Sequence, residues 1–186
     1  MSCEIELKYA IASTLCAHDV FTHPLIAPLI CGGTSIIAME SVYYDTGNRS
    51  RSLRRRSENG DFIFTLKSGN TGHGALSSRG EWEVSDDSLE SALARLCRLG
   101  APTLGISPDA PSIAAFSFTR TCARLDVSDS LSLTLCCDIG DTIHELELEL
   151  ICGEIAELTA FGECVCRTFD ARPESRSKLA RALLNK

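Results

Sequence analysis

Polar and apolar residues alternate along much of the chain with a period of two, which is the spacing of a β-strand with one buried face. In residues 4–8, Glu4, Glu6 and Lys8 fall on one face of such a strand, while Ile5 and Leu7 fall on the other. The pattern marks about eight segments of this kind. They are residues 4–8, 43–45, 53–56, 62–67, 79–84, 118–124, 131–135 and 144–150. The chain is therefore expected to consist mainly of β-strands.

Fewer segments have helical spacing, with apolar residues three or four positions apart. They are residues 89–99, 154–169 and 174–184. Polar residues before Leu89 offer an N-cap to the first of them, and Gly100 offers its C-terminal stop. Residues 11–31 are ambiguous because two prolines interrupt any long helix there, and the proline-rich residues 101–112 are predicted to form a connecting loop.

The chain has 186 residues, of which 44% are hydrophobic and 23% are charged. This length and composition favour one globular domain over residues 1–186 and exclude a disordered or fibrous protein. The formal net charge of −7 has the wrong sign for nonspecific attraction to nucleic acid or to an anionic membrane. We therefore expect no nucleic-acid partner and no membrane association.

The ten cysteines contain no CxxC pair and no second cluster of metal ligands. They are predicted to be reduced thiols that serve as small apolar residues. The N-terminus carries an acidic residue where a signal peptide carries basic ones, and no run approaches about 18 apolar residues. These features predict a cytoplasmic protein.

The charged residues of the predicted strands are sorted by sign, with carboxylates on the first and last strands and mostly Arg and Lys on the middle ones. The acids are Glu4, Glu6, Glu81, Glu83, Asp138, Glu145, Glu147 and Glu149, and the bases are Lys8, Arg54, Arg56, Lys67, Arg79, Arg120 and Arg124, which Lys178 could join. A solvated face would explain any one strand. Together the faces favour an α+β fold in which an eight-stranded antiparallel barrel closes around the charges and helices pack outside.

Facing clusters of acids and bases in one cavity indicate a particular kind of ligand. Hard divalent cations such as Mg²⁺ prefer carboxylate oxygens and often share them with phosphate oxygens. Arg binds phosphate through paired hydrogen bonds, and Lys binds it as a point charge. A polyanion and a metal ion held between such walls predict a site for phosphoryl transfer.

The same residues resemble a known family. Glu4-Ile5-Glu6-Leu7-Lys8 resembles the ExExK signature near the N-terminus of CYTH domains, the triphosphate tunnel metalloenzymes. Further matching segments follow in order along essentially the whole chain. They are residues 43–46, 53–56, 65–67 and 79–82, Arg120, Asp138, and residues 147–149 and 177–178. The resemblance is closest to the inorganic triphosphatase branch, and it implies an eight-stranded antiparallel tunnel.

The resemblance also implies roles for individual residues. Asp138, Glu147 and Glu149 match the positions that hold Mg²⁺ or Mn²⁺, and Glu4 and Glu6 match those that support a second metal ion or orient water. Whether Glu145 is a ligand or only pairs with an arginine stays open. The phosphate-binding positions correspond to Lys8, Arg54, Arg56, Lys67, Arg120 and Lys178, and Arg79 and Arg124 join them because they lie on the charged strand faces. Tyr43 and Lys67 match a pair assigned to proton transfer.

The leading functional hypothesis is metal-dependent hydrolysis of the terminal phosphate of inorganic triphosphate. The same cavity would also suit thiamine triphosphate or another organic triphosphate, or the conversion of ATP to cyclic AMP by a class IV adenylyl cyclase. A non-enzymatic sensor of polyphosphate or nucleotides is the remaining alternative. The expected partner is a small-molecule triphosphate, and a homodimer is compatible with the sequence.

Overall fold

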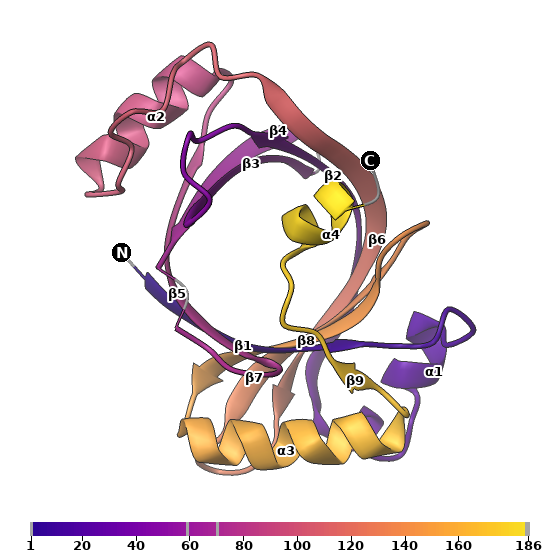
Figure 1. The fold of residues 1–186 in the computed structure, drawn as a ribbon. Helices are drawn as coiled ribbons and strands as arrows, with labels where there is room; N and C mark the ends of the chain where they lie inside the picture. The colour runs from indigo at the N-terminus through magenta and orange to yellow at the C-terminus, as the bar shows by residue number, and fades with distance from the viewer. Residues whose placement is uncertain (1, 59, 70, 185–186) are drawn as a thin grey trace.

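Eight antiparallel strands close into a barrel in the computed structural model, which describes residues 2–58, 60–69 and 71–184 (Figure 1). The strands are β1 (Ser2–Ala10), β2 (Ile30–Tyr44), β3 (Arg51–Glu58), β4 (Asp61–Ser68), β5 (Leu76–Ser85), β6 (Ser112–Asp126), β7 (Ser132–Ile139) and β8 (His144–Cys152). Their order is β5-β4-β3-β2-β6-β7-β8-β1, and β5 pairs with β1 to complete the ring. Closure leaves these eight strands without an open edge, and it confirms the predicted fold.

Alternation along each strand decides which side chains enter the barrel. On β1, Leu7 and Tyr9 are buried in a cluster outside the barrel, whereas Glu6 and Lys8 are buried inside it. The register sets Lys8 opposite Glu147 and Glu6 opposite Glu149 on β8. A shift by one residue would exchange the two faces, so the outer apolar cluster fixes the register of the inner charges.

Two apolar clusters cover the outside of the barrel. The larger lies between β1, β7 and β8 and the helix α3 (Ile155–Thr168), and the smaller lies between β3, β4 and β5 and the helix α2 (Leu89–Arg98) (Figure 1). Gly162 lets α3 approach β1, because a Cβ atom there would lie 2.4 Å from Leu7 Cδ1 and 2.6 Å from the Tyr9 hydroxyl. Each fully buried Leu in such a cluster stabilises the fold by roughly 1.5–3 kcal/mol.

The helix ends follow the sequence signals. The Ser88 side chain accepts a hydrogen bond from the Ser91 N–H, which caps the N-terminus of α2 at 3.2 Å. Gly100 has a φ of +82° just beyond its end. Residues 11–31, which the pattern left ambiguous, contain only the short helix α1 (Ala17–Phe21), the 3-10 turn η1 (Ala27–Leu29) and the start of β2. None of the described helices is long and apolar enough to cross a membrane.

Several elements differ from their predicted form, including β6, which begins at Ser112 and not at residue 118. β2 begins at Ile30, far before the predicted segment 43–45. The sequence pattern missed the start of this strand because Gly32 and Gly33 adopt positive φ and a register shift between Cys31 and Ser35 interrupts the alternation. The last helix, α4 (Lys178–Leu184), is shorter than predicted and places its first residues at the barrel interior instead of packing wholly outside (Figure 1). The two-residue strand β9 (Arg172–Pro173), which precedes it, pairs with β1.

Candidate functional site

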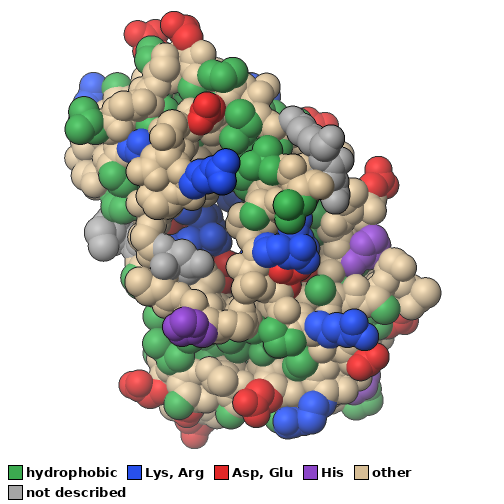
Figure 2. Space-filling view, viewed as in Figure 1, with side chains coloured by type: hydrophobic (Ala, Val, Ile, Leu, Met, Phe, Trp, Pro, Cys, Tyr) green, Lys and Arg blue, Asp and Glu red, His purple; other side chains and the backbone are tan. Residues whose placement is uncertain are grey.

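The barrel encloses a channel cavity of about 420 Å³ that is lined by inward-facing side chains from β1 to β8 and by the start of α4. Figure 2 shows Lys and Arg side chains around and within a hollow at the centre of one face. Most of the predicted site residues line this cavity. They are Glu4, Glu6, Lys8, Tyr43, Arg54, Arg56, Lys67, Arg79, Arg120, Glu147, Glu149 and Lys178.

Glu4 contacts a base on β4 and a base on β5, and Glu6 contacts the second of them. Lys67 Nζ lies 2.7 Å from Glu4 Oε1, and Arg79 bridges the two acids at 2.8 Å to each. Burial alone would raise the pKa of Glu4, but the ammonium of Lys67 and the guanidinium of Arg79 lower it to about 2. Glu4 is therefore ionised throughout the physiological pH range, and its charge is matched by adjacent cations.

A cluster of three carboxylates lies where β7 and β8 pair. One oxygen each from Asp138, Glu145 and Glu147 lies within 4.8 Å of the others, and Asp138 stands opposite Glu145 in the register. Hard oxygen donors in this number fit a Mg²⁺- or Mn²⁺-like cation. Lys178 now contacts all three, with Nζ 2.8 Å from Asp138 and 2.7 Å from Glu147, so an incoming cation would compete with its ammonium group.

Arg120 joins this cluster to the channel. Its guanidinium donates two hydrogen bonds of 2.7 Å to the two oxygens of Asp138 and a third of 2.5 Å to Glu147. Burial opposes ionisation of Glu147, but Lys178 and Arg120 hold its pKa well below the usual range of a glutamate. Glu147 is therefore an anion at neutral pH and a ready oxygen donor.

Glu149 has the opposite electrostatic character. It is the cross-strand neighbour of Glu6 and lines the same cavity. Burial raises the pKa of Glu149 to about 7, and the negative charge of Glu4 adds to that effect. A carboxyl group with this pKa is suited to accept or release a proton near neutral pH.

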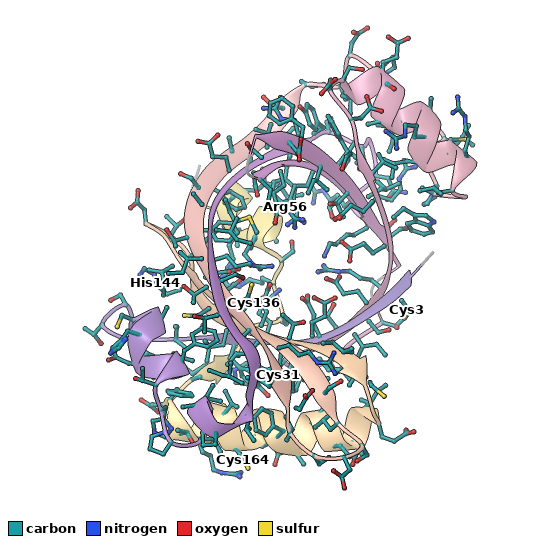
Figure 3. The ribbon with its side chains drawn as sticks, turned by 180° about the vertical axis from the view of Figure 1, so that it is seen from behind. Cys3, Cys31, Arg56, Cys136, His144 and Cys164 are labelled. Atoms are coloured by element: carbon teal, nitrogen blue, oxygen red, sulfur yellow. The ribbon has the colours of Figure 1, made fainter. Side chains whose placement is uncertain are left out.

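Three arginines on β3, Arg51, Arg54 and Arg56, have a buried Nε without a hydrogen-bond partner, and two of them, Arg54 and Arg56, line the cavity. Arg56 pairs with Glu58 at 3.0 Å, whereas Lys8 and Arg54 form no salt bridge with any residue that the structure describes. Figure 3 shows Arg56 within the ring of strands. Because buried unsatisfied donors are unfavourable, this wall is suited to bind an anion.

One stretch of the channel wall is apolar, which the charged-face analysis missed. Ile37 and Met39 from β2 line the cavity beside Tyr43, and the Tyr43 ring stacks on Phe116 with centroids 5.5 Å apart. Ile37 and Met39 belong to the part of β2 that the sequence pattern did not reveal. No hydrogen bond joins Tyr43 to Lys67 among the described residues, and Lys67 instead donates to Glu4.

Three of the charged residues considered in the sequence, Arg124, Asp138 and Glu145, do not line the cavity. The side chain of Arg124 is 55% exposed, pairs with Asp126 at 3.0 Å and does not line the cavity. Asp138 is fully buried behind the lining, where it binds Arg120 and Lys178. Glu145 is also fully buried and contacts both Lys178 and Arg181. The sequence pattern did not predict the role of Arg181, because the contact between α4 and β8 that brings it to Glu145 forms only in the folded chain.

The sequence matches a known family, and the fold matches solved structures. A family model described as the CYTH domain matches residues 2–183. No curated protein matches the sequence significantly. HpAC1 from Hippeastrum, an adenylyl cyclase candidate described as having a dominant triphosphatase activity, shares the fold with a TM-score of 0.70 and 19% identity over 98% of this chain and 96% of that chain. The PH1819 protein from Pyrococcus horikoshii OT3 matches with a TM-score of 0.58 and 21% identity over 98% and 99% of the two chains.

Proposed function

The chain belongs to the CYTH domain family, and from this premise we propose that it is a metal-dependent triphosphatase that hydrolyses the terminal phosphate of inorganic triphosphate. The observation that carries the proposal is an enclosed channel whose wall holds Lys8, Arg54 and Arg56, of which Lys8 and Arg54 form no salt bridge with the described residues and Arg54 and Arg56 have Nε donors without a partner. An extended polyanion supplies the acceptor oxygens that these donors lack. The dominant triphosphatase activity described for HpAC1 agrees with the proposal.

Different residues of the channel bind the substrate and take part in its hydrolysis. Lys8, Arg54 and Arg56 bind phosphate oxygens and align the chain of phosphates. Water attacks the terminal phosphorus, the bond to the bridging oxygen breaks, and phosphate and diphosphate leave. Glu149 accepts a proton from the attacking water, since its pKa of about 7 leaves part of it ionised at neutral pH. Positioning and electrostatic stabilisation thus supply most of the catalysis.

The acidic cluster of Asp138, Glu145 and Glu147 fits a divalent cation by its donor chemistry and its spacing. We propose that these carboxylates hold Mg²⁺ or Mn²⁺, which when bound would neutralise charge that develops on the phosphate oxygens. Lys178 would then turn from the carboxylates toward the substrate, because its ammonium group and the metal ion share the same oxygens.

The direct test is phosphate release from tripolyphosphate by the purified protein with Mg²⁺, with Mn²⁺ and with EDTA. We expect release with at least one metal ion and none with EDTA. A protein that binds tripolyphosphate in calorimetry but releases no phosphate with either metal ion would instead be a sensor, and this outcome would refute the proposal.

A second candidate is an organic triphosphate, because the apolar wall of Ile37, Met39 and Tyr43 is unnecessary for a purely inorganic polyanion. The Tyr43 ring, which stacks on Phe116, would suit contact with an aromatic base or ring of a substrate next to the phosphates. ATP and thiamine triphosphate belong in the same assay, with product separation to distinguish phosphate from cyclic AMP. A kcat/KM for either that exceeds the value for tripolyphosphate would favour this candidate.

A further inference from the structure

Two cysteines lie side by side on adjacent strands of the channel wall. Cys122 on β6 and Cys136 on β7 are directly opposite in the antiparallel register, and both line the cavity. Figure 3 shows Cys136 inside the ring of strands, whereas Cys164 lies on α3 outside it. Among the strand pairings of the described residues, no other two cysteines stand opposite each other. This arrangement differs from the isolated apolar thiols that the sequence predicts.

The geometry of the pair suits a covalent link. Directly opposed residues on antiparallel strands have Cα atoms roughly 4.5–5.5 Å apart. That separation lies inside the range of about 4.4–6.8 Å found for disulfides. The two strands therefore need little movement to join the sulfur atoms.

The surroundings also activate one of the two sulfurs. The Ser35 hydroxyl lies 3.2 Å from Cys122 Sγ. The hydrogen bond with the Cys136 thiol lowers the pKa of Cys122 to about 6, with help from Ser35 and the positive charge of Arg120, although burial opposes the shift. A thiolate, not a thiol, reacts with peroxides, so Cys122 is the attacking sulfur and Cys136 the resolving one.

We propose that Cys122 and Cys136 form a redox-modification site in the channel, at which hydrogen peroxide oxidises the pair to a cross-strand disulfide. The Cys122 thiolate attacks one peroxide oxygen, the O–O bond breaks, and hydroxide leaves, which gives a sulfenic acid on Cys122. Cys136 then attacks the Cys122 sulfur and displaces the sulfenic hydroxyl, which leaves as water with the Cys136 proton. The two thiols are oxidised by two electrons, and the peroxide is reduced.

The disulfide would join β6 and β7 beside the ion pair of Arg120 and Asp138, which is the next inward-facing pair along the same strands. Other cysteines lack this setting. Cys137 is fully buried in the outer apolar cluster, and the Cys166 thiol donates to the Ala171 carbonyl at 3.0 Å. Because Cys122 and Cys136 are the only cysteines directly opposed in the described strand pairings, a cross-strand disulfide is expected at this pair.

The test is peptide mapping of the full-length protein after brief treatment with hydrogen peroxide and alkylation under denaturing, non-reducing conditions. We expect Cys122 and Cys136 to be recovered as one linked peptide pair that is lighter by two hydrogens and is separated by dithiothreitol. In Cys136→Ser, dimedone should trap a sulfenic acid on Cys122. Cys97→Ser, in which an exposed cysteine on α2 is removed, is the matched control and should leave the pairing unchanged.

Both cysteines remaining fully alkylatable, under peroxide that oxidises Cys97, would overturn the proposal. So would a disulfide that joins Cys122 to any cysteine other than Cys136. The wild-type map decides the question even if the serine variants fail to fold. Because the readout is the covalent state of the thiols, its failure is distinguishable from a failure of the triphosphatase proposal.

Discussion

Two walls of the channel contain charged groups in contrasting states. On the side of β1, β7 and β8, carboxylates are matched by adjacent bases, as in the contacts of Glu4 with Lys67 and of Asp138 with Arg120 and Lys178. On β3, the Nε atoms of Arg54 and Arg56 are buried without hydrogen-bond partners; Arg56 pairs with Glu58, but Arg54 forms no salt bridge with any described residue. A matched buried pair is destabilising mainly when one member is removed, whereas an unmatched charge is unfavourable as it stands. The matched wall thus maintains the fold, and the unmatched wall is available to substrate.

The largest expected effect comes from Glu147 on the matched wall. Glu147→Gln removes the negative charge that Arg120 and Lys178 share and a proposed metal ligand. We expect kcat/KM for tripolyphosphate to fall roughly 100- to 1,000-fold, the range found when one electrostatic stabiliser is removed. Steady-state phosphate release checks this. Activity within a few-fold of the wild type would show that Glu147 does not hold the metal ion.

The next effect concerns the pH dependence of stability. The pKa of Glu4 is about 2 in the folded protein against 4.5 for the free group, so the ionised form is favoured by folding. Its contribution to the free energy of unfolding, about 3 kcal/mol, is present above pH 4.5 and is lost as the pH falls toward 2. Denaturant unfolding between pH 2 and 6, without divalent metal, measures it.

Glu4→Gln should flatten this acid limb of the stability curve, although it also leaves Lys67 and Arg79 with fewer partners. Glu163→Gln, at an exposed position on α3, is the matched control and should keep the wild-type slope. Parallel curves for Glu4→Gln and the wild type would mean that the pairing of Glu4 with its two bases contributes nothing to folding.

A smaller effect on binding separates the two walls most clearly. Arg54→Gln should weaken tripolyphosphate binding about 10- to 100-fold, because a charge-assisted hydrogen bond contributes about 1.5–3 kcal/mol. It should not lower Tm, since Arg54 forms no salt bridge with the described residues and its buried Nε has no partner. Calorimetry and thermal unfolding of the same sample check both. A lower Tm with unchanged affinity would reverse the roles assigned to the walls.

The smallest effect is expected at Arg124, which sequence reasoning placed in the channel and the structure places outside it. Arg124→Gln should change tripolyphosphate affinity by less than about two-fold and the free energy of unfolding by less than about 0.5 kcal/mol, as for an exposed ion pair. The binding assay used for Arg54 measures the first. A loss of affinity similar to that of Arg54→Gln would mean that Arg124 binds the substrate after all.

The period-two alternation predicted most of the inner face correctly, because a strand offers only two faces and the leucines occupy the outer one. It placed Glu4, Glu6 and Lys8 inside and Leu7 outside, as the structure does. It failed at Arg124, which shares a face with Arg120 but lies four residues further along β6, about 13 Å beyond it. Alternation gives the face of a residue but not its depth in the channel.

Other features depended on contacts that a linear pattern does not contain. The apolar residues Ile37 and Met39 follow the two glycines and the register shift that hide the start of β2. The burial of Glu145 depends on Lys178 and Arg181, which reach it from a helix more than thirty positions later in the sequence. The opposition of Cys122 and Cys136 follows from the register of β6 and β7, which neither segment encodes alone.

A crystal structure of the protein with tripolyphosphate and Mn²⁺ would locate both ligands. We expect the anion to lie in the channel with phosphate oxygens bonded to Arg54 and Arg56, and Mn²⁺ to be held by carboxylates of the cluster at Asp138, Glu145 and Glu147. Tripolyphosphate bound only on the outer surface, with no phosphate oxygen near Arg54 or Arg56, would refute the proposal.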